Sequence, residues 1–120
     1  MEKPIIAAMN GNVFAGGFLI ALNSDIRVGV EDTTFAITEL KMGRGSPWAT
    51  PLLWMLPLNM IIELTLTEQH ILATRMHQIG FINRLVKRDE LMPTAKAIAE
   101  CIRDNAYLSV MHPNNRYLER

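Results

Sequence analysis

The sequence predicts a mixed α/β fold, in which short buried strands alternate with helices. Three observations predict it. A continuous apolar run over residues 3–9 is typical of a strand that is buried on both faces. A glycine turn and a short apolar segment, residues 11–22, follow it and are typical of a strand-to-helix junction. Further along, an apolar stripe with helical spacing predicts one long amphipathic helix.

In the first part of the chain, the sequence predicts a short helix followed by two strands. Residues 15–23 are apolar on all sides, so we expect a buried helix there. Residues 26–30 alternate as a strand does, and residues 34–37 form another short strand. Asp25, between the helix and the first of these strands, is expected to serve a turn or a cap.

The middle of the chain is predicted to be helical. Residues 48–67 are almost entirely apolar, and we expect two short buried helices there with a break before Pro57. Residues 73–79 predict a further short helix that Gly80 ends. Residues 81–86 read as a short extended segment.

The last predicted element is the long amphipathic helix, which Asp89 is placed to cap. Its apolar residues recur at i, i+4, i+7, i+8, i+11 and i+15, at Leu91, Ala95, Ile98, Ala99, Ile102 and Ala106. We therefore expect residues 1–110 to form a partial domain, and residues 111–120 to be a loose tail.

Composition excludes several classes of protein. Of the 120 residues, 49% are hydrophobic and 20% are charged, which indicates a globular chain rather than a disordered one. The formal net charge is zero, whereas a dedicated nucleic-acid binder has a basic excess. No segment is long and apolar enough to span a membrane, and no N-terminal signal is visible. Cys101 is the only cysteine; we expect it to be a small buried residue in a cytoplasmic or organellar-matrix protein.

The glycine turn Ala15-Gly16-Gly17 is the strongest candidate for chemistry. Backbone N–H groups at a helix start have no internal partner and favour negative charge. Glycine also lets a ligand approach the backbone closely, so the turn can form half of an oxyanion hole. The alternative, which the local sequence alone favours, is a tight turn with close packing. A metal site is not expected, because His70 and His77 can share a helix face but no cysteine or carboxylate cluster completes a ligand set.

Six segments of the chain, taken in order, resemble the crotonase, or enoyl-CoA hydratase/isomerase, family. They are KPIIAAMNG (3–11), AGG (15–17), ALNSDIRV (21–28), FAITE (35–39), ELTLT (63–67) and IGFINRLV (79–86). Their order and spacing make the resemblance specific. It implies an α/β fold that is part of a crotonase-like ββα spiral with following helices. It also implies that the chain corresponds to the middle and later part of a crotonase and lacks the N-terminal region.

The resemblance implies a substrate and a mechanism. Family members bind an acyl-CoA thioester and stabilise an enolate-like anion with two backbone N–H groups. Gly16 matches one donor, and the other belongs to a loop upstream of this chain. Glu39 matches the second of the two glutamates found in the family's hydratases, but Leu19 stands at the position of the first. Water addition with two carboxylates is therefore in doubt, whereas the family's isomerases work with one glutamate.

Other roles that the resemblance implies concern binding. We expect Gly17, Leu19 and Trp48 to line the substrate, although Trp48 can equally belong to the core. Arg44 is expected to be solvated rather than to meet a charged group of the substrate. Glu63 is expected to be paired inside the fold or at a subunit contact. No cofactor is expected beyond the coenzyme A of the substrate, and the family's trimers and hexamers imply a homo-oligomer.

Two functions therefore stay open. The first is a crotonase-type enzyme that isomerises the double bond of an enoyl-CoA or carries out a hydratase-like reaction, with Glu39 as base and the Gly16 N–H as oxyanion donor. The second is a non-catalytic, truncated crotonase-like protein that assembles with itself or with a longer paralogue. Leu19 and the missing upstream donor favour the second, and this chain alone is expected to be weakly active or inactive.

Overall fold

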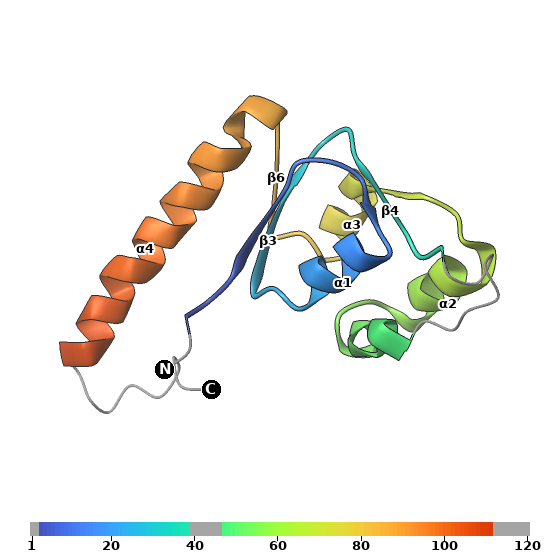
Figure 1. Ribbon diagram of the computed structural model, residues 1–120, viewed down its shortest axis with the longest axis horizontal. Coiled ribbons are helices and arrows are strands. Elements are labelled where there is room, and N and C mark those ends of the chain that lie inside the picture. The colour runs from blue at the N-terminus through green and yellow to red at the C-terminus, as the bar shows by residue number, and fades with distance from the viewer. Residues whose placement is uncertain (1–2, 39–46, 112–120) are drawn as a thin grey trace.

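The computed structural model describes residues 3–38 and 47–111, with side chains for residues 3–38 and 49–106. Two small sheets share one core, and a long helix covers the outer face of the first sheet (Figure 1). Strands and helices alternate along the chain, so the α/β class predicted from the sequence is confirmed.

The first sheet is parallel and has the order β1-β3-β6. Its strands are β1 (Ile6–Met9), β3 (Ile26–Val30) and β6 (Arg84–Val86). Side chains alternate across it, as the two-residue period of a strand requires. One face packs against the long helix through Ile6, Ala8, Val28, Val30 and Val86, whereas Ala7, Met9 and Leu85 turn to the main core. The predicted first strand is thus present but starts at Ile6 rather than at residue 3.

The second sheet has the order β2-β4-β5 and is built from very short strands. They are β2 (Val13–Phe14), β4 (Thr34–Ala36) and β5 (Ile71–Leu72). The pair β2–β4 is parallel and the pair β4–β5 is antiparallel. Strands β2 and β5 were not predicted, because two residues are too few to show an alternating pattern.

Three buried phenylalanine rings form the centre of the main core. Phe18 comes from helix α1 (Gly16–Leu22), Phe35 from β4 and Phe81 from the segment before β6. Their ring centroids lie 5.4 to 5.7 Å apart in edge-on arrangements, which aromatic rings prefer. The trio joins α1 to both sheets and so fixes where α1 begins.

Arg27 is a buried cation that ties α1 to the first sheet. Its Nε donates to the Phe81 carbonyl at 2.7 Å, and its Nη1 donates to the carbonyls of Ala21 and Ser24 at 3.2 and 2.8 Å. Its guanidinium carbon also lies 4.6 Å from the centre of the Phe81 ring. Burial lowers the pKa of Arg27 from its ordinary value, and the nearby Asp25 carboxylate acts in the opposite direction. Asp25 itself accepts the Ile5 N–H at 2.8 Å, a contact between the residues that precede β3 and β1 rather than a helix cap.

The apolar middle of the chain forms a 3-10 helix, η2 (Pro47–Trp54), and helix α2 (Leu58–Thr67). The break at Pro57 is confirmed, because Pro57 precedes α2 in an extended conformation. The expected burial is wrong, since five large side chains here are 47–81% exposed: Leu53, Trp54, Leu58, Ile62 and Leu66. Helix α2 is apolar on two sides, and the core covers only the side with Met60, Ile61 and Leu64. Glu63 on α2 is exposed, so pairing inside the fold is also wrong.

Helix α3 (Ala73–Gln78) ends as predicted at Gly80, whose φ of 92° suits glycine. The predicted extended segment is shorter than expected, because β6 starts only at Arg84. Asp89 lies inside the 3-10 turn η3 (Arg88–Glu90), one residue before the position that would cap the following helix.

The long helix α4 (Leu91–Met111) confirms the predicted stripe in part, since Leu91 and Ala95 are buried and Ile98 packs against the first sheet, whereas Ala99 is exposed. The helix continues to Met111, and residues 112–120 lie outside the described part, so the expected loose tail stays a prediction. Cys101 is exposed, so its expected burial is wrong; it lies on α4 away from the stripe. Over the part of the chain that the structure describes, no helix has the length and apolar character needed to cross a membrane.

Candidate functional site at the start of α1

The backbone is unusual just before α1. Ala15 precedes the helix with φ 47° and ψ −114°, a region that residues with a Cβ rarely adopt. Its carbonyl accepts the Leu19 N–H at 3.0 Å, which closes the first turn of the helix. Such strained residues cost about 1–3 kcal/mol and cluster at functional sites, so the turn is a candidate site on this ground also.

Gly16 and Gly17 form the first exposed turn of α1. A Cβ built at either position meets none of the described atoms within 4 Å, and neither glycine has a positive φ. Neither packing against the described residues nor backbone conformation therefore requires glycine there. Close packing among the described residues therefore does not explain the glycines, and the role of this turn stays a prediction.

One face of α1 continues this open surface. Leu19 and Ile20 follow Gly16 at i+3 and i+4, so they lie on the same side of the helix, and they are 37% and 70% exposed. The expectation of a helix buried on all sides is therefore wrong, because the core covers only Phe18, Ala21 and Leu22. Ile20 was not predicted to lie at this surface, although its i+4 spacing from Gly16 places it on the same side of the helix.

The parallel pairing of β2 and β4 brings the two candidate segments to one edge. Val13 is paired with Phe35 and Phe14 with Ala36, so both strands end at the same level. Gly16 follows the end of β2 by two residues, and Glu39 follows the end of β4 by three. Glu39 itself lies outside the described residues, and so does Arg44. Trp48 lies in η2, but its side chain is not described.

The two candidate histidines do not share a helix. His70 precedes α3, and its ring lies 4.8 Å from that of Phe14, whereas His77 lies within α3. The shared helix face that their spacing allows is therefore not formed. Among the described residues, no group of three or more His, Cys, Asp or Glu side chains is placed to hold a metal ion.

Two hollows on the described surface lie away from Gly16. A groove of about 320 Å³ runs between the start of β1 and α4, and its lining includes Lys3, Pro4, Ile6, Ile102 and Arg103. A second hollow of about 290 Å³ is lined by Val30, Glu31, Asp32, Lys87 and Arg88. Neither hollow includes Gly16.

Comparison with known proteins decides the family. The family model described as enoyl-CoA hydratase/isomerase matches residues 1–116. The chain belongs to this family. A carnitinyl-CoA dehydratase of Salmonella paratyphi A is 35% identical over 112 residues, which cover 92% of this chain and 43% of that enzyme.

Solved structures support the same conclusion for the fold. A solved enoyl-CoA hydratase of Mycobacterium tuberculosis superposes with a TM-score of 0.82 and 29% identity, covering 97% of this chain and 56% of that one. An enoyl-CoA hydratase of Mycobacterium paratuberculosis gives the same TM-score at 28% identity, covering 95% of this chain and 55% of that one. The crotonase-like fold expected from the resemblance is thereby confirmed, and this chain spans about half the length of these relatives.

Proposed function

We propose that this crotonase-family chain acts on an acyl-CoA thioester through a stabilised enolate. The Gly16 N–H is the proposed hydrogen-bond donor to the thioester oxygen, and Glu39 is the proposed acid/base. The observation that carries the proposal is the parallel register of β2 and β4, because both segments leave the sheet at the same edge. The names of the relatives, enoyl-CoA hydratase and carnitinyl-CoA dehydratase, supply the substrate class.

The proposed reaction moves one proton. Glu39 removes a proton from the carbon next to the thioester, and the electron pair moves to the carbonyl oxygen, which accepts the Gly16 N–H. When the same carboxylic acid returns the proton to a different carbon, the double bond has migrated and the enzyme is unchanged. Leu19, which stands where a second carboxylate would be needed, cannot move a proton. Isomerisation is therefore proposed ahead of hydration, with Leu19 and Gly17 contacting the substrate.

The expected rate from this chain is low. The chain supplies one proposed oxyanion donor, and removal of one such donor costs about 2.7–4 kcal/mol of transition-state stabilisation, or roughly 10²–10³ in rate. The assay must therefore detect slow enolate formation, and exchange of the proton next to the thioester with deuterated water meets that need.

The experiment follows this exchange on a 3-enoyl-CoA by NMR, with the full chain and two variants. Glu39→Gln removes the proposed base, and Glu63→Gln is the matched control because Glu63 is an exposed glutamate on α2. Exchange above the buffer rate that disappears in Glu39→Gln but persists in Glu63→Gln supports the proposal. Equal exchange in both variants, or none above buffer in the unaltered chain, overturns it.

The same samples separate the reaction types. With a 2-enoyl-CoA, hydration yields a hydroxyacyl product and loses the conjugated absorbance, whereas isomerisation of a 3-enoyl-CoA creates that absorbance. We expect the absorbance to rise with the 3-enoyl substrate. Loss of absorbance with the 2-enoyl substrate alone would instead assign a hydratase-like reaction.

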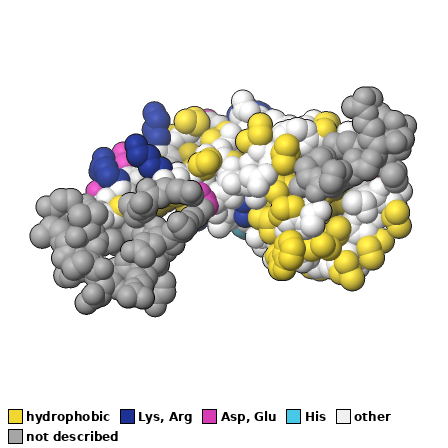
Figure 2. Space-filling model, turned by 60° about the horizontal axis from the view of Figure 1, so that its bottom comes forward, with side chains coloured by type: hydrophobic (Ala, Val, Ile, Leu, Met, Phe, Trp, Pro, Cys, Tyr) yellow, Lys and Arg dark blue, Asp and Glu magenta, His cyan; other side chains and the backbone are white. Residues whose placement is uncertain are grey.

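We also propose that the chain assembles with copies of itself. Hydrophobic side chains gather on the surface formed by η2 and α2 (Figure 2). Leu58, Ile62 and Leu66 follow one another at i, i+4 and i+8 along α2, beside Leu53 and Trp54. These five side chains leave on the order of 600 Å² of apolar surface open, which is the upper end of the about 300–600 Å² patch on a typical monomer. With no net charge, two copies do not repel one another strongly.

Sedimentation velocity tests the assembly. Leu66→Glu places a charge in the apolar surface, and Met92→Glu places one at a similarly exposed position on α4. We expect Leu66→Glu to shift the chain to the monomer and Met92→Glu to leave the oligomer intact. A monomeric unaltered chain at high concentration would contradict the proposal.

A further inference from the structure

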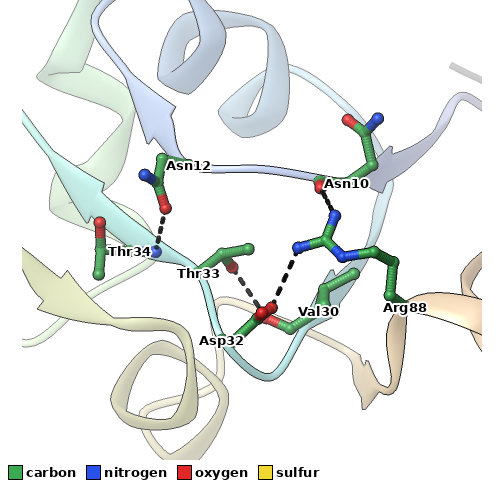
Figure 3. A network of polar contacts seen from close by, with 7 residues as sticks. All are labelled: Asn10, Asn12, Val30, Asp32, Thr33, Thr34 and Arg88. Carbon is green, nitrogen blue, oxygen red and sulfur yellow. Dashed lines mark hydrogen bonds and ion pairs between the residues drawn. The ribbon is translucent and has the colours of Figure 1, made fainter.

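One guanidinium joins the turns that lead into β2 and β4. Arg88, in the η3 turn after β6, donates through Nη1 to the Asn10 carbonyl (Figure 3). Its Nη2 lies 3.1 Å from Asp32 Oδ1 and donates to it. Asn10 lies at the start of the turn before β2, and Asp32 lies in the turn before β4. A single planar fork therefore holds two segments that are 22 residues apart in the sequence.

A second contact crosses directly between the same two turns. The Thr34 N–H donates to Asn12 Oδ1 at 3.0 Å, and the Thr33 hydroxyl donates to the Val30 carbonyl at 2.8 Å (Figure 3). The first bond links the residue before β2 to the first residue of β4, and the second closes the turn that leads into β4. Side chains in the turns therefore join these segments where the strands begin.

The strands themselves define their alignment weakly. β2 and β4 are paired over two residue pairs, Val13 with Phe35 and Phe14 with Ala36. Register depends on the hydrophobic pattern and on turn geometry, and a pattern of two residues specifies little. The contacts of the turns therefore add to the constraint that the packing of Phe18 against Phe35 places on the alignment of β2 with β4.

We propose that Arg88 is a positioning residue. It fixes how far β2 is displaced along its length relative to β4, and therefore where Gly16 lies relative to the segment that leads to Glu39. This inference rests on the proposed function of those two residues. Arg88 contacts Asn10 and Asp32 in the turns that precede β2 and β4, so it acts from the ends of these strands opposite to Gly16. A misplacement of about 1 Å can cost about 10² in rate, so a small slip between the two strands has a large effect on turnover.

If Arg88 is a positioning residue, its substitution should lower the rate of turnover without lowering the stability of the fold. The side chains of Arg88 and Asp32 are 58% and 73% exposed, and an exposed ion pair contributes little to stability. Lysine keeps the charge but is a point donor without the planar fork, so it does not hold two acceptors in the same geometry. Arg88→Lys is therefore the informative substitution, and the pair of Arg103 with Asp104 on α4, exposed to 71% and 68%, offers the matched control Arg103→Lys.

The experiment compares the full chain, Arg88→Lys, Arg103→Lys and Asp32→Ala. We expect Arg88→Lys to lower the kcat of deuterium exchange about tenfold with KM and Tm unchanged, Asp32→Ala to act in the same direction, and Arg103→Lys to leave all three unchanged. An unchanged kcat in Arg88→Lys overturns the inference. So does a lower kcat that is accompanied by a lower Tm, because the loss of rate would then follow from a loss of stability.

A measurement that needs no turnover keeps this inference separate from the proposed function. The amide resonances of Gly16 and Gly17 in ¹⁵N-labelled chain report the start of α1 directly. We expect them to shift in Arg88→Lys and Asp32→Ala but not in Arg103→Lys. Shifted amides in a chain without exchange would refute the proposed function alone, whereas exchange that persists with unmoved amides would refute the role of Arg88 alone.

Discussion

Replacing Gly16 by alanine is expected to change stability and function in opposite directions. The added Cβ meets no described atom within 4 Å, and the φ of Gly16 is not positive, so the fold has room for it. Alanine in a helix is more favourable than glycine by about 0.5–1 kcal/mol. We therefore expect Gly16→Ala to raise the free energy of unfolding by that amount, and the Tm by about 2–4 °C for a chain of this size.

The same methyl group occupies the space through which the thioester oxygen is proposed to reach the Gly16 N–H. We expect the rate of deuterium exchange to fall at least about tenfold, because a hydrogen bond at an oxyanion hole is lost or lengthened. Urea unfolding followed by circular dichroism measures the stability, and NMR measures the exchange. Gly80→Ala is the control, since the φ of 92° at Gly80 makes the same chemical change destabilising. A stabilised Gly16→Ala chain with full exchange would refute the reasoning about the donor, and a destabilised one would refute the reasoning about the open space.

Two further substitutions test the frame around the site. Arg27→Met keeps most of the side-chain volume but leaves the carbonyls of Ala21, Ser24 and Phe81 without their donor. We expect the free energy of unfolding, measured with urea, to fall by about 2–4 kcal/mol. This figure includes a partial offset, because the methionine chain has no buried cation to desolvate. A loss below about 0.5 kcal/mol would show that the three bonds contribute little net stability. Ala15→Gly relieves a φ of 47°, so we expect a gain of about 1 kcal/mol by the same assay; a loss would mean that Ala15 is not strained.

The parts of the fold that the sequence predicted are those where one local signal dominates. Pro57 breaks the apolar stretch, Gly80 ends α3 with a positive φ, and the stripe that begins at Leu91 turns α4 toward the first sheet. In each case the cause lies within a few residues of its effect. The same locality explains why the order of short motifs was enough to identify the family.

Burial was predicted less well, because it depends on what lies opposite a side chain. Helix α1 and helix α2 are apolar on more than one side, and their sequences do not say which side the core takes. Ile20 and Trp54 were expected inside and are largely exposed, and Cys101 was expected inside because cysteine usually is. For the candidate site, Gly16 begins α1 as the sequence predicted, whereas its role as a donor stays a prediction. The role of Glu39 also stays a prediction, because that residue lies outside the described part.

The two-pair ladder between β2 and β4 has a thermodynamic consequence for ligand binding. Short ladders open locally at a small free-energy cost, so their amides exchange with solvent well before the whole domain unfolds. A molecule that contacts the ends of both strands binds only when the two strands are paired, and so shifts the local equilibrium toward the paired state. Its affinity is lowered by the free energy needed to hold the strands together. Occupancy would then be visible as slowed hydrogen exchange in β2 and β4, while the first sheet under α4 stays unaffected.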